Sequence, residues 1–137
     1  MKKIDEEGLK LCMLQAEVFA DSLTVTLCSS PVFIRRFMNS EVAARMDRRG
    51  FLLESCDVES VLNEVDEQYG PTSYGRERYG REELYWLGYL YRYWAYTYEK
   101  SSKQVSNSWN SISDFYCTTS RYFEINQKIV RFYSPYR

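Results

Sequence analysis

Histidine is absent from the 137 residues of the chain, and this absence removes a large part of enzyme chemistry. Serine-histidine and cysteine-histidine catalytic pairs and HExxH zinc sites all need an imidazole as base or ligand. The nucleotide-binding patterns GxxxxGK[ST] and GxGxxG and the hydrolase pattern GxSxG are missing as well. Catalysis would require carboxylate, Tyr, Lys or Cys groups brought together by folding. We therefore expect no enzyme activity, no metal site and no cofactor.

Long apolar runs are also missing. No window approaches the eighteen apolar residues that a membrane span needs. Near the start, Lys2 and Lys3 are followed by three acidic residues at positions 5–7, so no apolar core of a secretory signal follows the basic residues. We expect a cytoplasmic protein that does not enter a membrane.

The four cysteines form no C-x-x-C pair, since they stand apart at Cys12, Cys28, Cys56 and Cys117. Without histidine, a zinc site would need all four thiolates from four distant elements. Reduced thiols in the core or on the surface are the default for such spacing in the cytosol.

Charge is almost balanced overall but uneven along the chain. The net charge is −1, yet residues 1–73 carry 8 basic and 13 acidic residues while residues 74–137 carry 10 basic and 6 acidic residues. This asymmetry is too mild for affinity that rests on phosphate contacts alone. It can orient a protein partner, or bring unlike faces of two copies together in a homodimer.

Helical periodicity dominates the first hundred residues. Apolar residues recur every three or four positions over residues 5–27, where the β-branched last turn predicts an early end. Ser30 and Pro31 predict the start of a second helix through residue 38, and Asn39 or Ser40 the start of a third that closes at Gly50. Asp57 predicts the start of a fourth helix, which Gly70-Pro71 ends.

Aromatic residues are in excess, at 17% of the chain with 13 tyrosines, and many fall in the helix expected over residues 82–98. Leu84, Leu87, Tyr91, Trp94 and Tyr98 form one apolar stripe at helical spacing. Further tyrosines and a tryptophan occupy much of the remaining circumference. A helix that is aromatic nearly all round is either central to the core or presents a face to a partner.

The expected fold is therefore mainly α: one domain over residues 1–137 that forms a compact bundle of four to five helices. Its helical body covers about residues 5–105, including a short helix that Ser101 or Ser102 caps. Residues 106–137 differ, since Ser and Asn accumulate first and aromatic, β-branched runs at 121–125 and 128–133 follow. The pair Asn126-Gln127 between these runs predicts a small C-terminal β-hairpin, although a helix also fits.

A candidate protein-binding surface combines the loop before the aromatic helix with one face of that helix. The loop, at residues 72–83, repeats the pattern Tyr-Gly-Arg-Glu, and we expect it to be mobile and charged. Tyr and Arg dominate protein-protein hot spots because they bury large area and keep a polar end. A solvated loop and a core helix would explain the same residues without any partner. The candidate partner-binding residues are Tyr74, Arg76, Arg78, Tyr79, Arg81, Tyr85, Tyr89, Arg92, Tyr93 and Tyr96.

Nucleic acid is the alternative partner for this aromatic-basic face. Aromatic side chains interleaved with arginine can stack bases and contact phosphates. The helix at 82–98 and a helix beginning at Lys103 would also resemble a helix-turn-helix unit, but the second helix is too short for a good recognition helix. Binding of nucleic acid would weaken steeply with added salt.

Two segments resemble a known family. They are FIRRFMNSEVAARMDRRGFLLES, from Phe33 to Ser55, and EELYWLGYLYRYWAYTYEKSSKQV, from Glu82 to Val105. They resemble short bacterial proteins associated with toxin-antitoxin-type loci, next to genes for small ADP-ribosyltransferase-like toxins. The resemblance covers about residues 30–105 and includes no catalytic motif. It implies an antitoxin-like or accessory protein that binds, and thereby inhibits, a toxin or other effector. From Ser106 onward the chain departs from the helical continuation of that family.

Overall fold

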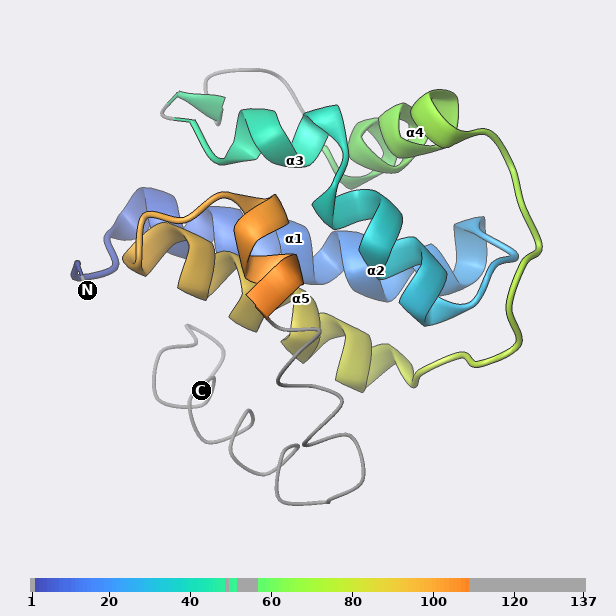
Figure 1. Cartoon of the computed structure of the whole chain (residues 1–137). Helices are drawn as coiled ribbons and strands as arrows, with labels where there is room; N and C mark the ends of the chain where they lie inside the picture. Colours follow the sequence, from blue (N-terminus) through green and yellow to red (C-terminus); the bar gives the residue numbers. More distant parts are fainter. Residues whose placement is uncertain (1, 49, 52–56, 109–137) are drawn as a thin grey trace.

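The computed structural model describes residues 2–48, 50, 51 and 57–108, and within them the protein is mainly helical with no strand (Figure 1). The labelled helices are α1 (Glu6–Val25), α2 (Ser30–Met38), α3 (Glu41–Met46), α4 (Val58–Tyr69) and α5 (Arg81–Thr97). Residues 102–108 are helical too. The predicted helical bundle is confirmed for this part of the chain. The predicted C-terminal hairpin lies outside the described residues, as do Cys56 and Cys117.

Most helix ends follow from single residues. Asp5, Ser40 and Asp57 cap α1, α3 and α4, each accepting a hydrogen bond from the backbone N–H three residues on. The first helix ends at Val25, as its β-branched last turn predicts, and Gly70 with φ of 77° follows the end of α4.

The cap of α2 and the end of α3 differ from the sequence predictions, whereas the cap at Ser101 is one of the two predicted there. Ser29 rather than Ser30 caps α2, because the Ser29 hydroxyl accepts from the N–H of Val32, so Pro31 stands one position further into the first turn. The third helix ends at Met46, before Gly50. Ser101 caps the helix at 102–108 in a reciprocal capping box with Gln104, whose side chain accepts from the Ser101 N–H at 3.0 Å.

The first helix is central to the described fold, with α2 and α4 on one side and α5 on the other (Figure 1). Phe19 of α1 meets Phe33, Phe37 and Tyr91 edge to face, at ring-centroid distances of 5.8, 5.3 and 6.1 Å. Such geometry suits the quadrupoles of aromatic rings, and it joins α1 to α2 and α5. None of the described helices is long and apolar enough to cross a bilayer.

Gly88 allows α1 and α5 to approach closely. A Cβ at this position would lie 2.7 Å from the Gln15 carbonyl oxygen and 3.0 Å from the Ala16 Cα. Both are backbone atoms of α1, so they cannot move aside without moving the helix. The two helices run in opposite directions, since the Lys2 N–H donates to the Thr97 carbonyl at one end and Arg81 pairs with Asp21 at the other.

Candidate protein-binding surface

The ten residues predicted to bind a partner separate into an exposed loop group and a buried helical group. Tyr74, Arg76, Arg78 and Arg81 are exposed, and Tyr79, Tyr85 and Tyr96 are half-buried. Tyr89, Arg92 and Tyr93 are buried, with exposed fractions of 1%, 1% and 4%. The expectation that these three reach the surface is therefore wrong, and they offer no face to protein or nucleic acid in this conformation.

Burial extends over consecutive residues in the middle of α5, from Gly88 to Tyr93. This part of the helix is central to the core, which is one of the two readings that its aromatic circumference allowed. Leu84 and Tyr91 of the predicted apolar stripe are buried, whereas Tyr98 is 51% exposed.

Arg92 is the centre of a buried polar cluster with Gln15, Asp47 and Ser102, the Arg92 cluster. Its guanidinium donates through Nε to Gln15 Oε1 at 2.8 Å, through Nη1 to Asp47 Oδ1 at 2.6 Å and through Nη2 to Ser102 Oγ at 2.8 Å. Gln15 in turn donates to the Gly88 carbonyl at 3.0 Å. Each nitrogen of the buried cation is thereby satisfied, which burial of a charge requires. Arg92 is a structural residue that joins α1, the end of α3, α5 and the helix at 102–108.

The loop at residues 71–80 is docked against α1 and α2, in contrast to the predicted mobile loop. Its carbonyl groups at Tyr74 and Glu77 accept hydrogen bonds from the N–H groups of Ser29 and Ser30, at 3.0 and 2.9 Å. Gly75 makes this approach feasible, because its φ is 86° and a Cβ there would lie 2.3 Å from Ser29 Oγ.

Two arginines of this region bind the end of α1, which has no basic residue in its own last turn. Arg78 donates to the carbonyl groups of Leu23, Thr26 and Cys28, and Arg81 donates to that of Ala20. Of these acceptors, Leu23 is in the last turn of α1, where carbonyl groups lack partners within the helix and carry partial negative charge, so the Arg78 guanidinium stabilises it. Arg78 thus holds the loop against the end of α1, and Arg81 does the same for the first turn of α5.

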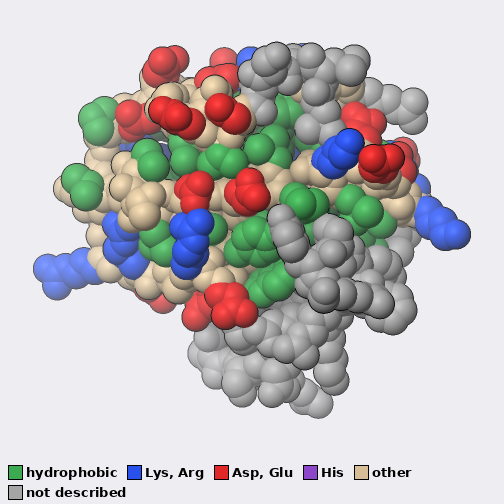
Figure 2. All heavy atoms as spheres, turned by 180° about the vertical axis from the view of Figure 1, so that it is seen from behind, with side chains coloured by type: hydrophobic (Ala, Val, Ile, Leu, Met, Phe, Trp, Pro, Cys, Tyr) green, Lys and Arg blue, Asp and Glu red, His purple; other side chains and the backbone are tan. Residues whose placement is uncertain are grey.

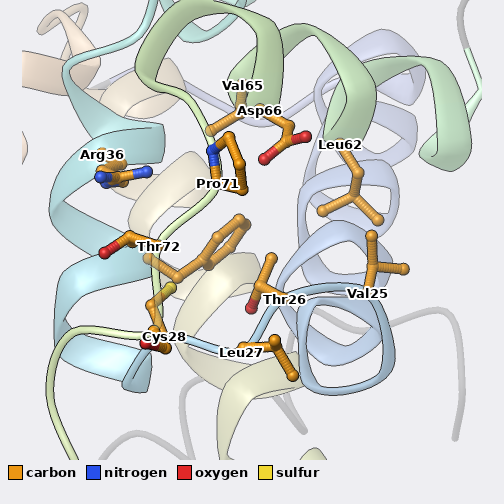
Figure 3. Close-up of a pocket in the computed structure, with 12 residues that line it drawn as sticks. Val25, Thr26, Leu27, Cys28, Arg36, Leu62, Val65, Asp66, Pro71 and Thr72 are labelled. Carbon is orange, nitrogen blue, oxygen red and sulfur yellow. The ribbon is translucent and has the colours of Figure 1, made fainter.

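A cleft opens beside this loop, between the ends of α1 and α4 (Figure 3). Its volume is about 350 Å³, within the range of small ligand pockets. Leu62, Val65 and Asp66 enter it from α4, Arg36 from α2, and Pro71 and Thr72 from the loop, while residues 25–28 form the side nearest the end of α1. Arg36 is already engaged, because it donates to the Gly70 carbonyl at 2.7 Å and lies over the Tyr69 ring at 5.4 Å.

A second hollow of about 340 Å³ adjoins the cleft and shares Val25 and Leu62 with it. We call it the acidic depression, because its lining includes Asp21, Asp57 and Glu59. Seen from behind, acidic side chains gather over α4, with hydrophobic side chains next to them (Figure 2). The cleft and the acidic depression lie next to each other along α1 and α4, and we call the two together the α1–α4 groove.

Exposed hydrophobic residues concentrate around the cleft. The large exposed hydrophobic side chains among the described residues are Val25, Leu27, Tyr69, Tyr74 and Tyr98. Val25 and Leu27 line the cleft, with exposed fractions of 57% and 77%, while Tyr69 and Tyr74 stand within two residues of lining positions. Only Tyr98 lies elsewhere, at the end of α5. Hydrophobic side chains that cluster on a surface mark interaction sites more often than scattered ones do.

Two of the four cysteines lie among the described residues. Cys12 and Cys28 are free and buried, and burial raises the pKa of Cys12 to about 12. Burial also raises the pKa of Tyr89 above its ordinary value of 10. In the ranges that the structure covers, no group of three His, Cys, Asp or Glu residues could hold a metal ion.

The sequence interpretation missed the α1–α4 groove. The β-branched end of α1 and the acidic residues of α4 were visible as separate signals, but nothing local indicates that the two helices lie side by side. Comparison with protein-family models, curated proteins and solved structures finds no match to this chain. The geometry of the cleft, its rim and the docked loop therefore carries the functional interpretation.

Proposed function

We propose that the chain is a non-enzymatic protein-binding module that binds its partner through the cleft and its rim. The rim is the set of exposed hydrophobic residues in and beside the cleft: Val25, Leu27, Tyr69 and Tyr74. The observation that carries the proposal is the position of the exposed hydrophobic side chains. Four of the five large ones in the described part of the chain lie in or beside one cleft, and the fifth lies at the other end of α5. Apolar surface that stays in water in the free protein gains free energy when a partner covers it.

The docked loop supports the same surface. Tyr74 is 77% exposed, yet its backbone is tied to Ser29 by a hydrogen bond. A large aromatic side chain on an ordered backbone is typical of an interface anchor, since little conformational freedom remains to be lost on binding. Of the residues predicted from sequence, Tyr74 and Arg76 remain as candidate contacts, with Tyr79 half-buried next to them.

The partner class follows from the resemblance described above. An antitoxin-like protein acts by binding a toxin or other effector and blocking it, so such an effector is the first partner to seek. The non-enzymatic part of the proposal is supported by the buried Cys12, whose raised pKa leaves its thiol a poor nucleophile.

A tagged pull-down from the native host tests the proposal, with lysates compared before and after nuclease treatment. We expect a stoichiometric protein that survives nuclease and is lost from a variant carrying Leu27→Ser and Tyr74→Ser. Tyr98→Ser is the matched control, because Tyr98 is a similarly exposed hydrophobic residue away from the cleft. Retention of the partner by the double variant would show that the cleft rim is not the interface. Recovery that disappears with nuclease would make nucleic acid the ligand.

A further inference from the structure

We infer that the α1–α4 groove seats an amphipathic helix of the partner protein, with an apolar stripe facing the groove and lysine or arginine residues along its flank. This inference rests on the proposed function and specifies the chemistry of the partner. It is carried by three features of the groove: its shape, its apolar floor and its unpaired acidic wall.

The shape favours a helix. The groove follows α4 from Val58 to Asp66, a stretch of about 13 Å, enough to accommodate about two and a half helical turns. A helix that packs along two others fills the furrow between their side-chain ridges. Addition of a partner strand is disfavoured, because it would need a free strand edge for backbone pairing and the described residues contain no strand.

The floor of the groove is apolar and partly open to water. Val25 and Leu62 are shared by the cleft and the acidic depression, so both hollows have apolar lining where they meet. Leu62 is buried, while Val25 and Leu27 stay exposed. An apolar stripe at positions three and four apart on a partner helix would cover these exposed side chains.

The acidic wall of the groove indicates that the partner helix is basic. The fourth helix carries Glu59, Glu64, Asp66 and Glu67 and no basic residue. Glu64 is paired with Arg45, and Asp21 of the opposite wall is paired with Arg81. Glu59 and Asp66 line the groove and make no ion pair with any residue that the structure describes, while Asp57, which also lines it, caps α4. Unpaired carboxylates beside an apolar floor complement a helix with basic flanks, and they disfavour an acidic one.

The probe for this inference is a synthetic peptide of leucine and lysine, patterned as an amphipathic helix of about four turns. Its dissociation constant is measured by fluorescence anisotropy, and the contacts are mapped by backbone amide shifts of the full chain. We expect shifts in α4 and in residues 21–28. A peptide of the same composition with scrambled leucines, and one with glutamate in place of lysine, should each bind at least about tenfold more weakly, a difference of about 1.4 kcal/mol.

Charge variants locate the contact. Glu59→Lys combined with Asp66→Lys should weaken peptide binding about tenfold or more, a loss of about 1.4 kcal/mol. The matched control is Glu67→Lys combined with Glu99→Lys, which makes the same change of net charge at exposed positions outside the groove lining. Leu27→Ser should also weaken binding, whereas Tyr98→Ser should not.

Equal dissociation constants for the groove variants and their controls would overturn the inference. So would peptide-induced shifts confined to α5 or to residues 74–80 of the docked loop, which do not line the groove. Concentration-dependent shifts of the groove amides without peptide would identify a second copy of the chain as the occupant, which also overturns it. The proposed function fails separately, in the pull-down, if no nuclease-resistant partner depends on Leu27 and Tyr74.

Discussion

The Arg92 cluster and the α1–α4 groove both combine charged and apolar side chains, but they treat charge in opposite ways. In the Arg92 cluster the cation is 1% exposed and its three nitrogens have three different partners. In the groove, Glu59 and Asp66 are exposed and lack ion pairs among the described residues. A charge that is fully partnered inside the protein serves folding. Charges left open beside exposed hydrophobic residues are available to another molecule, so the comparison separates a structural region from a candidate functional one.

Replacing Arg92 should destabilise the Arg92 cluster and leave the α1–α4 groove unchanged. Arg92→Met removes the donor from Asp47 and Gln15, and we expect the free energy of unfolding to fall by about 3 kcal/mol. Urea unfolding followed by circular dichroism measures the loss. Arg92→Lys, which keeps the charge but not the three-way geometry, should lose less, and Arg76→Met is the exposed control. A loss below about 1 kcal/mol for Arg92→Met would show that the cluster is not structural.

Gly88→Ala tests the packing beneath the same cluster. The added methyl group would lie 2.7 Å from the Gln15 carbonyl oxygen, so α1 and α5 must separate. We expect a loss of about 1–3 kcal/mol in thermal or urea unfolding, as for other overpacked cores. Gly80→Ser is the control, because a Cβ at Gly80 has its nearest neighbour at 3.8 Å and serine is a good cap for α5. An unchanged free energy of unfolding for Gly88→Ala would mean that α1 and α5 do not need the close approach that Gly88 allows.

Arg78→Ala tests whether this arginine anchors the loop beside the cleft. The substitution removes the hydrogen bonds to the carbonyl groups of Leu23, Thr26 and Cys28 at the end of α1. We expect a loss of about 1 kcal/mol in unfolding free energy. Hydrogen exchange of the loop amides at residues 72–80 should accelerate, because the loop opens locally without global unfolding. Arg76→Ala should leave exchange unchanged, and an unchanged rate in Arg78→Ala would contradict the anchoring role.

The smallest expected effect is a loss of stability in acid, to which the Asp5 cap of α1 and the Asp57 cap of α4 both contribute. The pKa of Asp5 lies below its ordinary value of 3.8 because the Tyr96 hydroxyl and the Gly8 N–H donate to it, and the pKa of Asp57 is lowered mainly by the Ser60 N–H. Their contribution to stability is complete above pH 3.8 and is lost as the pH falls through the lowered values. Asn in place of either Asp keeps the cap without the charge, so unfolding curves of the two Asn variants should respond less to acid. With no histidine, little change is expected between about pH 6 and 8.

Local signals in the sequence predicted the fold well and the surface poorly. Asp57, Ser40 and the β-branched end at Val25 are short-range signals, since capping and branching act within one turn. The burial of Arg92 depends on Gln15 and Asp47, which are 77 and 45 positions away. An arginine among tyrosines looks the same in sequence whether it faces water or a distant carboxylate. The anchoring of Arg78 was hidden for the same reason, because its acceptors are backbone carbonyl groups at the end of another helix.

The docked loop also bears on the speed of recognition. The hydrogen bonds from Ser29 and Ser30 to the loop hold the backbone around Tyr74 before any partner arrives. The entropy of ordering that backbone is therefore lost during folding, and encounter with a partner does not have to wait for the loop to rearrange. Association at this surface should then be limited by orientation, in the ordinary range of about 10⁵–10⁷ M⁻¹s⁻¹. Differences in affinity among rim variants should appear mainly as differences in the lifetime of the complex.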